Sequence, residues 1–188
     1  MVKRKVRHKR KYRIAISDDD PILISNYRRV LELSGYDVEF YSFVDEVVEL
    51  VSTEIRPIDL FVIDIVQPPG KSFASKPTEN GMYTGLYLAH YIRQKMPKAP
   101  IILFSIASLP SLRKAAEQLT DNLDECILLK KGETMPTEFL EIINHYFDEF
   151  SLASTQKHSI FKRLFRSLML QPNISGVGID LKELGKQK

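Results

Sequence analysis

The stretch Leu60-Phe61-Val62-Ile63-Asp64-Ile65 predicts both the fold of the chain and the place of its chemistry. Its apolar run has the length and composition of a strand buried on both faces, as in a parallel sheet that helices cover. Asp64 stands where this run ends and where a buried strand reaches solvent. We therefore expect Asp64 to lie at the edge of a sheet and to be the central residue of a site there.

Two strand–helix units precede this stretch. Residues 12–17 form the pattern of a short strand that runs into Asp18-Asp19-Asp20-Pro21. Asp20 supplies an N-cap acceptor and Pro21 suits the first helical position, so a helix is expected to begin here. Its apolar residues recur at helical spacing: Ile22, Leu23, Tyr27, Val30, Leu31 and Leu33. A second strand and a second helix are expected at residues 38–41 and 45–52.

The units that follow continue the same alternation. Strands are expected at Ile101–Ser105 and Cys126–Leu129, and helices at residues 86–96, 109–119 and 139–147. Alternating strands and helices favour right-handed crossovers and a parallel sheet, here an α/β fold with five strands and helices on both faces. Parallel strands end at one edge, where open α/β sheets bind ligands. Asp18, Asp19 and Asp64 are therefore expected to converge there, beside Ser105 and Lys130.

Carboxylates a few ångströms apart repel one another by several kcal/mol unless something neutralises them. A divalent cation that prefers oxygen ligands would do so, and Mg²⁺ fits because it takes one or two carboxylates, a carbonyl and waters. With the cation in place, a carboxylate can accept a phosphoryl group whose oxygens the Ser105 hydroxyl and the Lys130 ammonium would stabilise. The pattern therefore favours a magnesium-dependent phosphoacceptor.

In the order and spacing of these motifs the chain resembles the receiver domain of bacterial two-component response regulators. The resemblance covers about residues 11–150 and rests on the acidic turn, the strand before Asp64, Gly85-Leu86, the strand ending at Ser105 and Leu129-Lys130. It implies the doubly wound, flavodoxin-like receiver topology. It also implies a cytoplasmic protein that is not an enzyme acting on other molecules, although it catalyses its own phosphorylation and dephosphorylation with Mg²⁺.

The resemblance also assigns roles to individual positions. Asp64 matches the phosphoacceptor, and Asp18 and Asp19 match the acidic pair that holds Mg²⁺ together with Asp64. The backbone carbonyl of Val66 would be the remaining metal ligand from the protein. Ser105 matches the hydroxyl residue that moves toward the phosphoryl group. The phosphoryl donor would be a histidine kinase or a phosphotransfer protein.

The active-site lysine has two candidates. Lys130 is preferred because Ile127, Leu128 and Leu129 then fill the strand before it, and Lys131 is the alternative. With Lys130 in this role, the sequence departs from the family at two places. Lys131 stands where the family usually has proline, and Ile127 stands where it usually has an aromatic residue.

Charge is strongly segregated along the 188 residues. Eight of the first 13 residues are Lys or Arg, and residues 151–188 carry seven basic and two acidic side chains, so a net charge of +3 leaves residues 14–150 at −10. The expected organisation is a basic arm at residues 1–11, a receiver domain at 12–150 with a long loop at 66–84, and an extension at 151–188. The extension is expected to contain an amphipathic helix at about residues 159–170. A single cysteine, Cys126, excludes an internal disulfide and fits a reducing cytoplasm.

Three functions are compatible with these features. The first is a phosphorylated receiver that signals through an output protein, with a homodimer as a further possibility. The second is a docking module that keeps the fold without phosphorylation, although the retained polar positions argue against it. The third is a regulator whose basic ends bind nucleic acid or a membrane surface. No helix-turn-helix pattern supports this third function. The loop at 66–84 either covers the site or contacts a partner through Lys71, Phe73, Lys76 or Tyr83, or it is an inert insertion.

Overall fold

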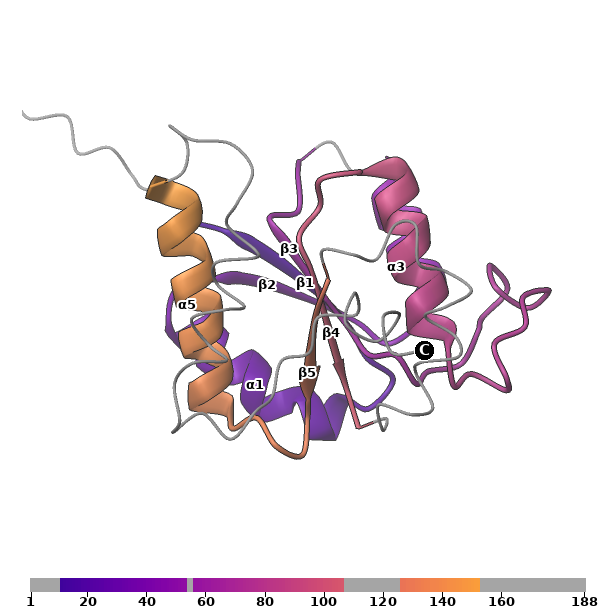
Figure 1. Ribbon diagram of the computed structural model, residues 1–188, viewed down its shortest axis with the longest axis horizontal. Coiled ribbons are helices and arrows are strands. Elements are labelled where there is room, and N and C mark those ends of the chain that lie inside the picture. The colour runs from indigo at the N-terminus through magenta and orange to yellow at the C-terminus, as the bar shows by residue number, and fades with distance from the viewer. Residues whose placement is uncertain (1–10, 54–55, 107–125, 153–188) are drawn as a thin grey trace, which may run out of the picture.

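The computed structural model describes residues 11–53, 56–106 and 126–152 (Figure 1). In chain order the elements are β1 (Arg13–Ser17), α1 (Pro21–Leu33), β2 (Asp37–Tyr41), α2 (Val44–Thr53), β3 (Leu60–Ile63), α3 (Thr84–Lys95), β4 (Ile101–Ser105), β5 (Ile127–Lys130) and α5 (Pro136–Leu152). The helix expected at 109–119 and the amphipathic helix expected at 159–170 lie outside the described residues. So does the basic arm, except for Lys11.

The five strands form one parallel sheet in the order β2-β1-β3-β4-β5. Figure 1 shows α1 and α5 on one side of the sheet and α3 on the other, where it packs with α2. The predicted α/β fold class, with a five-stranded parallel sheet wound on both sides, is confirmed. Among the described residues, no helix is both long and apolar enough to cross a membrane.

Alternation along the central strands builds two separate hydrophobic cores. In β3, Leu60 and Val62 pack into the core under α1 and α5, whereas Phe61 and Ile63 pack into the core under α2 and α3. β4 repeats the pattern with Ile102 and Phe104 against Ile101 and Leu103. A strand covered on both faces must be apolar at every position, so the continuous run before Asp64 was a valid signal.

The start of α1 is as the sequence predicts, but its buried face is not. The Asp20 carboxylate accepts hydrogen bonds from the backbone N–H groups of Ile22 and Leu23, with Pro21 in the first turn. The buried residues are Ile24, Tyr27 and Leu31, whereas Ile22, Leu23 and Leu33 are exposed. The predicted apolar stripe was therefore partly wrong.

The loop at 66–83 is anchored to the domain along its length. Phe73 is buried in the core under α2 and α3. The Asp45 carboxylate of α2 accepts hydrogen bonds from the backbone N–H groups of Lys71 and Ser72, at 2.9 and 2.8 Å. Tyr83 is buried as well, while Lys71 and Lys76 are exposed. Phe73 and Tyr83 therefore contribute to the core and do not present a surface to a partner.

A close approach between α3 and the end of β3 fixes the position of the Asp64 backbone. Gly85, in the first turn of α3, donates its N–H to the Ile65 carbonyl at 3.0 Å. A Cβ added at Gly85 would lie 1.9 Å from the Asp64 carbonyl oxygen. Only glycine permits this contact, because both partners are backbone and neither can turn aside.

Gly85→Ala is expected to lower the free energy of unfolding by about 2–3 kcal/mol, the upper part of the usual cost of forcing atoms into a packed site. Gly132→Ala is the matched control, because a Cβ at Gly132 meets nothing within 4 Å. The control should change stability by less than about 0.5 kcal/mol. Urea denaturation measures both. Equal midpoints for the two variants would contradict the close approach.

Candidate functional site

Three carboxylates converge at the edge where β1 and β3 end. Asp18 and Asp19 directly follow β1, and Asp64 directly follows β3, its neighbour in the sheet. One carboxylate oxygen from each lies within 4.8 Å of the other two. Asp18 and Asp64 are buried, with 1% and 5% of their surfaces exposed, whereas Asp19 is exposed. The predicted convergence of these three side chains is confirmed.

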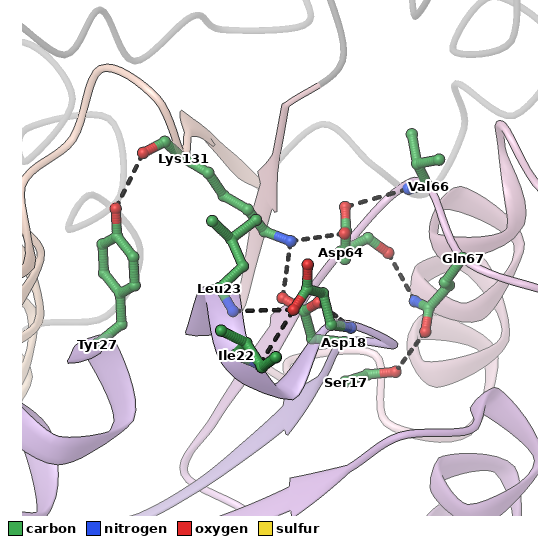
Figure 2. Close-up of polar contacts among 10 residues, drawn as sticks. Ser17, Asp18, Ile22, Leu23, Tyr27, Asp64, Val66, Gln67 and Lys131 are labelled. Atoms are coloured by element: carbon green, nitrogen blue, oxygen red, sulfur yellow. Dashed lines mark hydrogen bonds and ion pairs between the residues drawn. The ribbon is translucent and has the colours of Figure 1, made fainter. Parts of the chain in front are cut away.

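A lysine ammonium lies between the two buried carboxylates. Lys131 Nζ is 2.7 Å from Asp18 Oδ2 and 2.6 Å from Asp64 Oδ2 (Figure 2). The Lys131 side chain is only 2% exposed. Burying two carboxylates without a cation would be strongly unfavourable, so this ion pair is what allows Asp18 and Asp64 to leave solvent together.

The structure contradicts the preference for Lys130 as the lysine beside Asp64, because Lys131 is the one that contacts it. Lys130 is the last paired residue of β5, opposite Ser105, and its ammonium contacts Glu133 at 2.6 Å. Side chains alternate along a strand, so the position after Lys130 lies on the opposite side, the side of Leu129. The prediction ended the strand at the last apolar residue, Leu129. In the structure the pairing of β5 with β4 continues through Lys130.

With Lys131 as the lysine beside Asp64, the positions to compare with the receiver pattern move by one residue. Gly132 follows Lys131, and Leu128 stands three positions before it. The proline and the aromatic residue that the family usually carries at these positions are therefore still replaced. Among the described residues there is no cis peptide bond.

Tyr27 and Ser105 hold the backbone of Lys131. The Tyr27 hydroxyl lies 2.9 Å from the Lys131 carbonyl oxygen (Figure 2). It also lies 2.8 Å from the Thr134 carbonyl oxygen, and its single proton is shared between the two acceptors. The Lys131 N–H donates to the Ser105 carbonyl at 3.1 Å. The Tyr27 ring packs edge-on against Phe104 and Phe139. A rigid aromatic residue from α1 thereby fixes the turn from which the ammonium reaches the carboxylates.

Ser105 and Val66 belong to segments next to Asp64, in the neighbouring strand and in the chain directly after it. Ser105 ends β4, the strand next to β3, and is 1% exposed. The Val66 N–H donates a hydrogen bond to Asp64 Oδ1 at 3.1 Å. The Asp64 carboxylate therefore has one oxygen directed to a backbone N–H and the other to Lys131. The roles of the Ser105 hydroxyl and the Val66 carbonyl toward a ligand stay predictions.

No family model and no curated protein matches the chain. Solved structures do match. A CheY-like response regulator receiver domain protein from Methanospirillum hungatei JF-1 is 24% identical with a TM-score of 0.55, over 74% of this chain and 96% of that one. The N-terminal domain of a response regulator/sensory box/GGDEF three-domain protein from Carboxydothermus hydrogenoformans is 20% identical, with a TM-score of 0.57, over 76% and 98%. The chemotaxis protein CheY4 of Vibrio cholerae is 15% identical, with a TM-score of 0.52, over 72% and 98%.

The fold is that of response regulator receiver domains. At these identities the likeness concerns the path of the backbone, so the chemistry of the site must be argued from this chain's own residues. The receiver fold places Asp18, Asp19 and Asp64 at the carboxyl edge of the sheet, and the acidic cluster is compatible with the metal site of receiver domains.

Burial and charge oppose each other at the site. Burial raises the pKa of Asp18 from 3.8 to about 6, against the opposite effect of Lys131. Partial burial likewise raises the pKa of Asp19, although this residue is exposed. For Lys131, burial is the largest single influence and lowers the pKa, but the Asp64 and Asp18 carboxylates together outweigh it and leave the pKa raised. Lys131 is therefore charged at neutral pH.

Sequence reasoning missed two residues that support the site. Tyr27 was counted only as a core residue of the first helix, because its spacing is that of a core position. Gln67 was not singled out at all. Its side-chain amide donates to the Asp64 carbonyl at 2.6 Å and accepts from the Ser17 hydroxyl at 3.0 Å. A polar residue in an irregular segment gives no periodic signal, so neither contact could be found from the sequence.

Lys131→Met is expected to lower the free energy of unfolding at neutral pH, without divalent cations, by about 3 kcal/mol, because it leaves two buried carboxylates without their cation. Lys130→Met is the matched control and should cost less than about 1 kcal/mol, since Lys130 makes an exposed pair with Glu133. Chemical denaturation in EDTA measures both. A larger loss for Lys130→Met would restore the original assignment.

Proposed function

We propose that this protein is a phosphoacceptor response regulator, which takes a phosphoryl group from a phosphohistidine onto Asp64 and signals through contacts with another protein. The observation that carries the proposal is the Lys131 ammonium, 2.6 Å from Asp64 Oδ2 within a cluster of three carboxylates. A buried carboxylate beside a fixed cation, at the open edge of the sheet, is arranged to accept an anionic group.

The proposed reaction requires little covalent chemistry from the chain. An Asp64 carboxylate oxygen forms a bond to phosphorus while the bond from phosphorus to the donor's imidazole nitrogen breaks. The imidazole ring, protonated on its other nitrogen before transfer, takes the bonding pair and leaves as a neutral ring. Lys131, already at hydrogen-bond distance from Asp64, would neutralise one phosphoryl oxygen, and the Ser105 hydroxyl would donate to another. The buried position of Asp64 limits access by water.

The donor set fits a hard divalent cation. Three carboxylates within 4.8 Å and one nearby backbone carbonyl are oxygen ligands of the kind that Mg²⁺ takes, and Lys131 alone leaves the cluster with net negative charge. Asp18, Asp19, Asp64 and the Val66 carbonyl would hold the ion. When bound, Mg²⁺ supplies positive charge that lets an anionic phosphoryl group approach the carboxylates. Catalysis by the chain of its own phosphorylation and dephosphorylation belongs to this proposal.

The surface around the site supports docking of a protein. The described residues include seven exposed large apolar side chains, of which six follow strands at the edge that carries Asp64: Ile22, Leu23, Phe43, Met82, Ile106 and Met135. Leu33 is the exception, at the far end of α1. Exposed apolar side chains in the segments that follow strands at the same edge as a charged centre suit a partner that excludes water as it transfers a group. A cytoplasmic location, a histidine kinase or phosphotransfer protein as donor, and an output protein complete the proposal.

Incubation with phosphoramidate and Mg²⁺, followed by intact mass measurement, tests the proposal. The wild type is expected to gain one phosphoryl group, and Asp64→Asn none. Asp45→Asn is the matched acidic control, because Asp45 accepts backbone hydrogen bonds of the loop and lies outside the carboxylate cluster. A wild type without a mass gain would favour the docking module without phosphorylation. An undiminished gain in Asp64→Asn would place the phosphoryl group elsewhere.

Mg²⁺ is expected to stabilise the fold at neutral pH and to lose this effect as the pH falls below about 6, the pKa to which burial raises Asp18. The folded state holds this proton more tightly than the unfolded chain, so the metal-free protein should lose stability as the pH rises from about 4 through about 6. A cation bound to the ionised carboxylate offsets that loss.

Thermal unfolding with Mg²⁺ or EDTA across this pH interval measures the effect. Asp18→Asn should remove most of the Mg²⁺-dependent shift, since it removes one charged ligand. A shift of the same size at both ends of the interval would mean that Asp18 is not a ligand.

A further inference from the structure

We propose that Gln67 is a positioning residue for the acidic site, through which the long loop at 66–83 fixes the Asp64 backbone and the direction of the Val66 carbonyl. The inference rests on the proposed function, because Val66 matters only if its carbonyl is a metal ligand. It assigns a role to a side chain that was not among the site residues predicted from the sequence.

The Gln67 amide joins the ends of the two strands that carry the carboxylates. Its Nε2 donates to the Asp64 carbonyl oxygen at 2.6 Å, and its Oε1 accepts from Ser17 Oγ at 3.0 Å (Figure 2). Ser17 is the last residue of β1 and immediately precedes Asp18. Gln67 is only 2% exposed. The Asp64 N–H already donates to the Ser17 carbonyl at 2.8 Å, and this buried amide adds a second, side-chain link between the ends of β1 and β3.

The backbone of Gln67 is held by the closing end of the same loop. Its N–H donates to the Gly81 carbonyl at 3.1 Å. In a trans peptide the carbonyl points opposite to the N–H, so this bond directs the Val66 carbonyl away from Gly81. Gly81 has φ +99°, and a Cβ there would lie 2.8 Å from the Gln67 carbonyl oxygen. Glycine is thus required where the loop closes on Gln67.

The outer part of the loop is anchored separately. Asp45 binds the N–H groups of Lys71 and Ser72, and Phe73 is buried in the core under α2 and α3. These anchors hold the loop to α2 and α3, while Gln67 is the loop side chain that reaches the Asp64 backbone. Loosening the outer anchors therefore loosens the loop without removing a contact to the site.

The chemistry of the amide suits this place. The Asp64 carbonyl needs a donor and the Ser17 hydroxyl can use an acceptor, and a glutamine side chain supplies both without charge. A glutamate would lose the donor and would add a negative charge beside three carboxylates. A methionine has similar length and neither polar group. Groups that orient metal ligands without touching the metal commonly change metal affinity tenfold or more when they are removed.

The test compares Gln67→Met with Asp45→Asn in the full chain. Gln67→Met is expected to weaken Mg²⁺ binding roughly tenfold and to slow phosphorylation by phosphoramidate at saturating Mg²⁺ by a similar factor. Asp45→Asn should lower the thermal midpoint while Mg²⁺ affinity stays as in the wild type. Affinity is read from a Mg²⁺ titration of the unphosphorylated protein, and phosphorylation from intact mass.

Two results would overturn the positioning role. A Gln67→Met variant with a lower thermal midpoint but wild-type Mg²⁺ affinity and phosphorylation rate would show that Gln67 only tethers the loop. Alternatively, Asp45→Asn could weaken Mg²⁺ binding as much as Gln67→Met, so that any loosening of the loop would suffice. A wild type that neither binds Mg²⁺ nor gains a phosphoryl group overturns the proposed function and this inference together, whereas an active wild type matched by Gln67→Met overturns only the inference.

Discussion

The buried contact of the Lys131 ammonium with Asp18 and Asp64 is the constraint on which the rest of the site depends. Two carboxylates that are almost fully buried cannot both stay ionised without a compensating cation, because removing a charge from water costs several kcal/mol even after relaxation. Lys131 offsets part of this cost only while its ammonium stays within hydrogen-bond distance of both. The ends of β1, β3 and β5 must therefore be held in one fixed arrangement.

Support for that arrangement comes from both faces of the sheet. On the face of α1 and α5, the Tyr27 hydroxyl holds the Lys131 and Thr134 carbonyls at the turn after β5. On the other face, α3 approaches so closely at Gly85 that its backbone touches that of Asp64. The apolar cores under the helices thus do more than stabilise the fold. They place one rigid group on each side of the buried ion pair.

The sequence was enough to predict the features that follow from the repeated alternation of strands and helices. It was not enough where the result depends on the position of one residue. A continuous apolar strand ending in Asp64, within a βαβ alternation, was enough to place Asp18, Asp19 and Asp64 at one edge. The lysine was misplaced because side chains alternate along a strand, so an error of one residue in the end of β5 exchanges the inward and outward positions. Gln67 escaped notice because its partners, Ser17 and the Asp64 carbonyl, are brought to it by the fold and leave no pattern in the chain.

The charge balance of the site indicates how it would respond to phosphorylation. Three carboxylates and one ammonium carry a net charge of −2, which one divalent cation cancels. In the proposed reaction the single negative charge of Asp64 is replaced by a phosphoryl group with a charge of roughly −2. The Lys131 ammonium is then attracted more strongly to the phosphoryl group than to the Asp18 carboxylate. The Lys131 backbone is bonded to the Ser105 carbonyl and to the Tyr27 hydroxyl. A shift of the ammonium toward the phosphoryl group would therefore pull on the end of β4 and on α1, without the proline or the aromatic residue that usually accompanies the lysine in receivers.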